Sequence, residues 1–172
     1  MKKRWICLFV KNEIGVLARI SGLFSGKAYN LNSLTVGTTE DKTISRMTIS
    51  LTSDDKTFEQ VKKQLNRSVE VIKVVDYTDI PIHMKELMFV KITNCSDKDV
   101  AEIFRIAQVF HIGVIDYSRD AVLLESVQEE SKNDDLIALL ERYYANRIEI
   151  VRGGGVAIET VSKGKPIALQ SC

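Results

Sequence analysis

Two hydrophobic periodicities alternate along residues 5–77, and their order restricts the fold more than any other feature of the chain. Apolar side chains occupy both faces of residues 5–10, which predicts a buried strand. The next apolar residues recur at helical spacing and predict one inward stripe, formed by Leu17, Ile20, Leu23 and Phe24. Strands are then predicted at 29–36, 45–51 and 69–77. Between the last two, Asp54-Asp55 can cap a helix with Phe58, Val61 and Leu65 facing inward. This β-α-β-β-α-β order is the ferredoxin-like pattern.

The second half of the chain repeats this order, at an offset of about 82 positions. A segment of mixed polarity around Pro81 separates the two copies. We therefore expect an α+β protein with two tandem ferredoxin-like βαββαβ domains, at 1–78 and 86–172, joined by a linker at 79–85. Because the core of so small a domain stabilises it only weakly, we also expect pairing between domains or chains, and hence a homodimer or higher oligomer.

Composition argues against several classes of protein. The net charge is +1, so the basic face of a nucleic-acid-binding protein is not expected, and the middle strands lack the aromatic residues on which RNA bases stack. The apolar run Trp5–Val10 is shorter than a secretory signal requires, and no run approaches the roughly 18 apolar residues of a membrane span. Three cysteines and two histidines show no metal-ligand spacing. We expect a cytoplasmic protein without metal, membrane or nucleic acid.

No motif for catalysis is recognisable, and we expect no catalytic residues. Gly153-Gly154-Gly155 lacks the Lys and Ser or Thr of a phosphate-binding loop, and a flexible turn or bulge is the favoured interpretation. The segment around Asn12 and Gly15 is more informative, because the unpaired N–H groups at the start of a helix suit a carboxylate and glycine permits close approach of the backbone. The residues alone leave open that Asn12 is a simple helix cap, that Gly15 only shapes a turn and that Asn30 is an ordinary turn residue.

Three motifs make a more specific interpretation of this region possible. They are N-E-I-G-V-L-A-R-I-S-G-L-F-S at 12–25, Y-N-L-N-S-L-T-V-G-T-T-E-D at 29–41 and S-R-M-T-I at 45–49. Over residues 5–78 the chain resembles the N-terminal ACT domain of the regulatory (small) subunits of acetolactate synthase. The second half resembles the C-terminal domain of that family more by layout than by residues.

The resemblance implies regulation without catalysis by this chain. In that family the large catalytic subunit carries thiamine diphosphate, magnesium and FAD, and the small subunit activates it and confers feedback inhibition, usually by valine. The resemblance also implies that the amino acid lies between two ACT domains of a dimer. The implied ligand-binding residues are Asn12, Ile14, Gly15, Val16 and Leu17 on one chain, with Asn30 and Leu31 on the other.

Two positions depart from the family pattern, and each bears on ligand binding. Many members have proline where this chain has Ile14, and the usual R-G-Y-N is Lys27-Ala28-Tyr29-Asn30 here. The polar turn that follows is a candidate contact with the catalytic subunit, through Thr39, Glu40, Asp41 and an exposed Arg46. The alternative function is a free-standing ACT-type amino-acid sensor without an enzyme partner, and a purely structural oligomer is a third.

Overall fold

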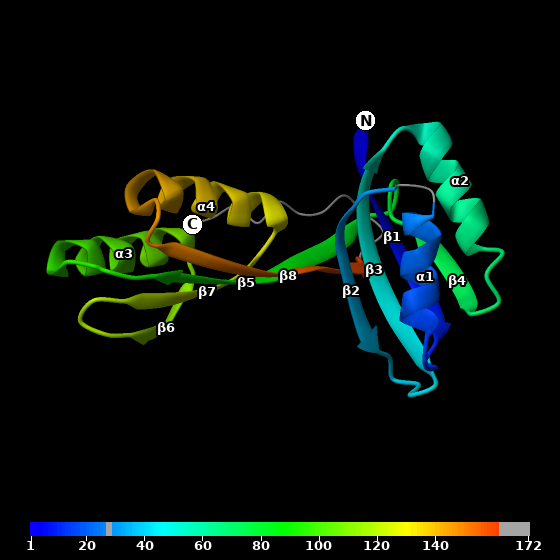
Figure 1. The fold of residues 1–172 in the computed structure, drawn as a ribbon, viewed down its shortest axis with the longest axis horizontal. Helices are drawn as coiled ribbons and strands as arrows, with labels where there is room; N and C mark the ends of the chain where they lie inside the picture. The colour runs from blue at the N-terminus through cyan, green and yellow to red at the C-terminus, as the bar shows by residue number, and fades with distance from the viewer. Residues whose placement is uncertain (27–28, 162–172) are drawn as a thin grey trace. The chain divides into compact units, whose positions relative to one another are not determined.

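The computed structural model describes residues 1–26 and 29–161, which divide into two compact units (Figure 1). The first unit is formed by Met1–His83 together with the described residues from Gly155 onward. Its elements are β1 (Lys2–Lys11), α1 (Val16–Ser25), β2 (Leu31–Thr38), β3 (Ile44–Ser53), α2 (Asp55–Leu65) and β4 (Val71–Asp76). The predicted β-α-β-β-α-β order is therefore confirmed for the first half.

The first sheet is antiparallel, with the strand order β2-β3-β1-β4. Both helices cover the same face of this sheet (Figure 1). The core lies between them and includes Ile6, Leu8 and Met47 from the strands, Ile20 from α1 and Phe58 from α2. The α2 helix begins where the sequence predicts, because the Asp54 carboxylate accepts a hydrogen bond of 2.7 Å from the Thr57 N–H.

The second unit, Met84–Gly154, repeats the pattern around a separate core. Its elements are β5 (Ile82–Ile92), α3 (Asp97–Phe110), β6 (Gly113–Tyr117), β7 (Val122–Gln128), α4 (Glu130–Tyr144) and β8 (Ile148–Glu159). The strand order is β6-β7-β5-β8. Ser96 and Asp99 form a reciprocal capping box that starts α3. Both halves thus have the predicted ferredoxin-like fold.

The structure corrects the predicted stripe of α1. Val16 is 2% exposed and faces the core with Ile20 and Phe24, whereas Leu17 is 46% exposed. Since α1 begins at Val16, positions i, i+4 and i+8 form the inward face, and Leu17 lies to one side of it.

Strand boundaries also differ from the sequence-based expectations at the ends of the second unit. β5 begins at Ile82, inside the segment 79–85 that was expected to be a linker. β8 continues through Gly153–Gly155, where a flexible turn or bulge was expected, and Gly154 alone among these glycines has a positive φ, of 77°. The last described residues belong to the first unit, whereas the sequence-based division placed them in the second.

Candidate functional site

The turn between β1 and α1 is built on Gly15, which is the N-cap of α1. Its φ of 85° and ψ of −8° lie in the left-handed region, where a Cβ atom crowds the neighbouring carbonyl. No side chain caps the helix, and among the backbone N–H groups of its first turn that of Val16 donates to the Glu13 carbonyl at 3.3 Å. An uncapped helix start on a glycine turn is suited to an anionic group of a ligand.

Asn12 fixes this turn from outside the helix. Its backbone N–H donates to the Thr43 carbonyl at 2.7 Å, and its side-chain Nδ2 donates to the Lys42 carbonyl at 2.9 Å. Asn12 is therefore not the helix cap that the sequence left open. It holds the β1–α1 turn against the β2–β3 turn, with its side chain exposed.

Arg19 adds positive charge beside Gly15, a feature that the sequence reasoning missed. A Cβ on Gly15 would lie 3.7 Å from Arg19 Nη1. Arg19 Nε is 2.8 Å from Glu70 Oε1, and a hydrogen bond from Ser68, with smaller effects of Arg19 and Lys11, lowers the pKa of that carboxyl. The first turn of α1 contains no acidic residue. The i, i+4 spacing from Gly15 was the signal that places Arg19 on this side of the helix.

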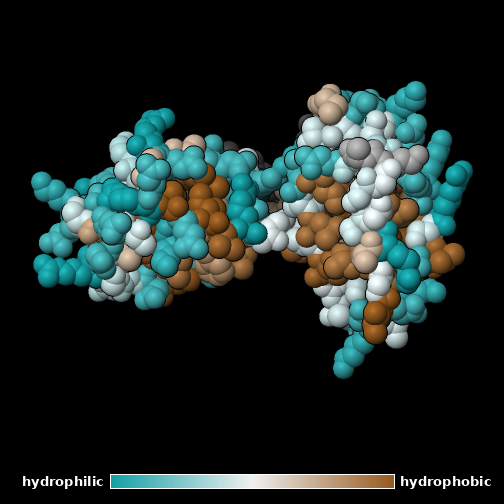
Figure 2. Space-filling view, in the orientation of Figure 1, coloured by the Kyte–Doolittle hydropathy of each residue, from teal (hydrophilic) through white to brown (hydrophobic). Residues whose placement is uncertain are grey.

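Apolar side chains surround the turn. Ile14 is fully exposed, Leu17 is half-exposed, and Val16 is buried in the core. The space-filling view shows hydrophobic surface beside α1 (Figure 2). Exposed aliphatic groups next to uncapped N–H groups suit a small ligand that has both a charged and an apolar end.

Asn30 and Leu31 lie at the opposite end of the first unit. Asn12 is hydrogen-bonded to Thr43, just before β3, whereas Leu31 pairs with Leu51 near the end of that strand. Because an extended strand rises about 3.3 Å per residue, these points are about 26 Å apart. One chain therefore does not bring the two predicted halves together. Ala28, the second departure from the family pattern, is outside the described residues.

The β2–β3 turn is ordered by its own side chains. Thr39 Oγ1 donates to the Asp41 carbonyl at 2.9 Å, and Asp41 accepts from the N–H and the hydroxyl of Thr43 at 2.9 and 2.6 Å. The hydrogen bonds from Thr43 lower the pKa of the Asp41 carboxyl. Glu40 is exposed at the tip. Of the residues proposed to contact a partner, Thr39 and Asp41 thus have a structural role in the turn.

Arg46 is not the exposed side chain that the sequence suggested. It is half-buried, and its Nη2 donates to the Tyr77 hydroxyl at 2.7 Å and to the Ala157 carbonyl at 2.6 Å. Arg46 therefore links Tyr77, which follows β4, to Ala157 in β8.

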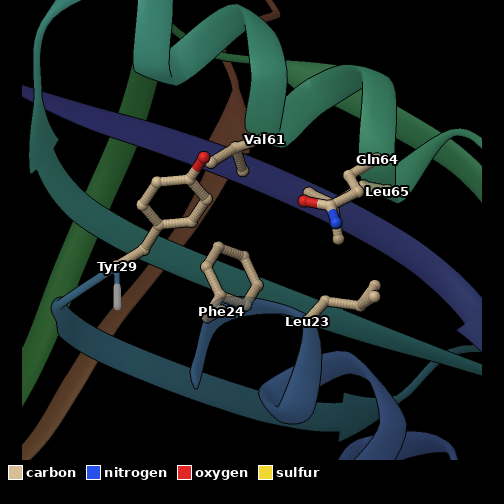
Figure 3. A pocket seen from close by; sticks show the side chains of 6 residues that line it. All are labelled: Leu23, Phe24, Tyr29, Val61, Gln64 and Leu65. Carbon is tan, nitrogen blue, oxygen red and sulfur yellow. The ribbon is translucent and has the colours of Figure 1, made fainter. Parts of the chain in front are cut away.

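A crevice between α1 and α2 is a packing feature and does not form a ligand site. It is lined by Leu23 and Phe24 from α1, Val61, Gln64 and Leu65 from α2, and Tyr29 (Figure 3). These side chains pack closely enough to exclude water. Elsewhere in residues 1–26 and 29–161, no group of three His, Cys, Asp or Glu side chains is placed to hold a metal ion. None of the described helices is long and apolar enough to cross a membrane.

Comparison with known proteins covers both units. Residues 6–73 match the family described as the AHAS small subunit-like ACT domain, and residues 85–161 match the family described as the small subunit of acetolactate synthase. The first match confirms that the first unit is an ACT domain.

Individual relatives agree along nearly their whole length. The acetolactate synthase small subunit of Aquifex aeolicus is 41% identical over 92% of this chain and 81% of that protein. The small subunit of Bacillus subtilis is 39% identical over 90% and 89%. The crystal structure of the acetolactate synthase small subunit from Thermotoga maritima superposes with a TM-score of 0.83, at 32% identity, over 94% of this chain and 99% of that one.

Proposed function

The chain belongs to the acetolactate synthase small-subunit family, and on that premise we propose that it activates a thiamine-diphosphate-dependent catalytic subunit and makes it sensitive to a branched-chain amino acid, with valine as the first candidate. As a regulatory subunit it has no catalytic role of its own. Thiamine diphosphate, magnesium and FAD would be bound by the catalytic partner.

The Gly15 turn is the observation that supports the ligand site. The ligand carboxylate would accept hydrogen bonds from backbone N–H groups of Gly15 to Leu17, where the helix dipole and Arg19 favour an anion. The Val16 N–H would exchange its bond to the Glu13 carbonyl for one to the ligand. The ammonium would meet the Asn12 and Asn30 side chains, which offer carbonyl oxygens. The branched side chain would pack on the exposed aliphatic groups of Ile14 and Leu17 and on the partly buried Leu31.

A second copy of the chain would complete this site. β2 is an edge strand, so its outer side has backbone groups available for pairing with another chain. Two copies related by a two-fold axis perpendicular to β2 would pair their β2 strands antiparallel, and the start of β2 in one would then lie beside the Gly15 turn of the other. This arrangement accounts for the separation of the two halves within a single chain.

Titration calorimetry of the chain with valine tests the ligand site. We expect saturable binding that Asn12→Ala weakens about tenfold or more, because a hydrogen bond to a charged group and the anchor to the Lys42 carbonyl are both lost. Asn66→Ala is the matched control, since Asn66 is also exposed and donates Nδ2 to a backbone carbonyl at 3.0 Å. Equal weakening in both variants, or no binding of valine, leucine or isoleucine by the unmodified chain, would contradict the proposal.

Activity of a thiamine-diphosphate-dependent catalytic subunit, titrated with this chain, tests the partner. A free-standing sensor would bind valine and leave the enzyme unchanged. Glu40→Ala is expected to raise the chain concentration needed for half-maximal activation about threefold, as loss of one charge at the rim of an interface does. Glu40 is the cleanest probe, because Thr39 and Asp41 also shape the turn. Glu141→Ala, an exposed glutamate of α4, is the control. Identical activation curves would exclude the turn as a contact.

A further inference from the structure

The end of the described chain lies on the face of the first sheet that carries no helix. Cross-strand register puts Thr35, Thr48, Cys7 and Val75 in one row on this face, because these residues are direct neighbours on β2, β3, β1 and β4. Ile6, Leu8 and Met47 alternate with this set and face the helices. Residues 155–161 belong to the same unit, and Ala157 is 1% exposed.

Two side chains bind the backbone of this returning segment. Thr35 Oγ1 donates to the Gly155 carbonyl at 2.9 Å, and Arg46 Nη2 donates to the Ala157 carbonyl at 2.6 Å. The Thr160 N–H donates to the Pro81 carbonyl at 3.0 Å and closes the segment at its other end. Both side-chain contacts reach carbonyl oxygens, so they depend on the path of the backbone.

Contacts with Cys7, Phe9 and Tyr77 hold the Arg46 guanidinium in place, in addition to its contact with the segment. Its Nε lies 3.1 Å from Cys7 Sγ, its Nη2 donates to the Tyr77 hydroxyl, and its carbon lies 5.5 Å from the centre of the Phe9 ring. Burial, together with the contact with Cys7, raises the pKa of Tyr77 to about 12, so the phenol stays neutral near pH 7. These contacts fix the direction in which Arg46 donates.

The segment also connects the proposed ligand site to the second unit through the chain itself. Thr35 lies in β2, the strand that begins at Leu31, and the second unit ends at Gly154, one residue before the carbonyl that Thr35 binds. A residue of β2 therefore contacts the first peptide that follows the second unit.

We propose that Thr35 and Arg46 form a latch on residues 155–157 that transmits the state of the amino-acid site in the first unit to the second unit. The latch is inferred from the hydrogen bonds of Thr35 and Arg46 to the Gly155 and Ala157 carbonyls, and its role in transmission rests on the proposed function. Thr35 and Arg46 act here as positioning residues, since neither needs to touch the amino acid.

Thr35→Val tests the latch with little change in shape, because it replaces only the donating hydroxyl, and Thr35→Ser is the matched variant that keeps it. Hydrogen exchange of the amides at 156–160 in the full chain is expected to rise about fivefold in Thr35→Val, as the net loss of one hydrogen bond produces, and to return toward the unmodified rate in Thr35→Ser. Unchanged exchange in Thr35→Val would overturn the latch. Arg46→Lys, which keeps the charge and loses the planar fork, provides the same comparison at the second contact.

Transmission is tested in the complex with the catalytic subunit. We expect Thr35→Val to bind valine within about twofold of the unmodified chain, while the valine-saturated complex is at least about fivefold more active. Faster exchange with unchanged binding and unchanged inhibition would overturn transmission. Weaker binding that fully accounts for weaker inhibition would also overturn it. If the unmodified chain binds no branched-chain amino acid, the proposed function fails, and the exchange comparison still decides whether the latch exists.

Discussion

Gly15→Val is expected to abolish detectable valine binding while the chain remains folded. At φ 85° an L residue costs about 1–2 kcal/mol, and a β-branched residue is the least tolerated in this region. A Cβ at this position meets nothing closer than Arg19 Nη1, at 3.7 Å, so the protein side of the turn has room for it. The added methyl groups instead occupy the space from which a carboxylate would approach the N–H groups. Calorimetry is expected to show affinity at least about 30-fold lower, with a cooperative thermal transition by circular dichroism.

A matched substitution distinguishes an effect on the Gly15 turn from a general effect of replacing a glycine in or next to α1. Gly22→Val changes an exposed glycine in the middle of α1, where no atom lies within 4 Å of an added Cβ. Its backbone is helical, so valine is accommodated and valine binding is expected to persist. If Gly22→Val removes binding as completely as Gly15→Val, the effect belongs to the stability of α1 and the site is placed wrongly.

Mixed dimers determine whether the two halves of the site come from different chains. Gly15→Val damages one half and Asn30→Ala the other, so each variant alone is expected to lack binding. In a mixed two-fold dimer, one site receives both substitutions and the other receives neither. Random mixing is therefore expected to restore about a quarter of the sites, at normal affinity. No restoration after unfolding and refolding the two variants together would show that the site is built within one chain.

The order of elements was predictable from sequence because its signals are local. A run of apolar residues on both faces specifies β1, and alternating apolar residues specify β3. The caps at Asp54 and at Ser96 with Asp99 specify where α2 and α3 begin. The start of α1 was harder to predict. A short helix with Val16 and Leu17 adjacent allows two similar stripes, and the choice depends on the N-cap, which is a glycine in a conformation that the sequence does not state.

The path of β8 was not predictable in the same way. Three consecutive glycines weaken any strand prediction, and the contacts that hold the returning segment join residues 120 and 111 positions apart. For the candidate site, the sequence located the Gly15 turn. The anchoring of Asn12 to the Lys42 carbonyl and the proximity of Arg19 to Gly15 became evident only from the three-dimensional structure. The wide separation of Asn12 from Leu31 follows from strand register, which patterning alone does not determine.

A buried polar network in the second unit illustrates a further limit of the patterning. Asn133 is completely buried in α4, although it is a polar residue. Its Nδ2 donates to Glu86 Oε2 at 3.0 Å, and its Oδ1 accepts from the Ser126 hydroxyl at 2.7 Å. Arg152 meets the same Glu86 carboxylate with both Nε and Nη2, at 3.0 and 2.6 Å. α4 and β8 are thus joined to β5 at one carboxylate, and β7 is joined to it through Asn133.

Arg152→Met is expected to destabilise the second unit by about 3–5 kcal/mol at pH 7, because it leaves the buried Glu86 carboxylate without its counter-charge. Urea unfolding of the full chain measures this loss as a lower midpoint. Arg105→Met is the matched control, since Arg105 also pairs with a glutamate, Glu102, but both side chains are more than half exposed. The control is expected to leave the midpoint almost unchanged.

The pH dependence of the deficit identifies its cause. Burial alone would raise the pKa of Glu86, but the hydrogen bonds from Arg152 and Asn133 outweigh burial and lower it. A lowered pKa in the folded state means that the carboxylate contributes stability above its unfolded pKa of about 4.3, and that this contribution is lost as the pH falls through the folded value. Without Arg152, burial dominates, and the folded pKa rises above the unfolded one. The stability difference between the two proteins is therefore expected to shrink as the pH falls from about 6 toward 4, because protonation removes the unpaired charge from the variant first. A deficit that stays constant over this range would instead attribute it to lost packing of the Arg152 side chain, and the double variant Glu86→Gln with Arg152→Met would then recover no stability.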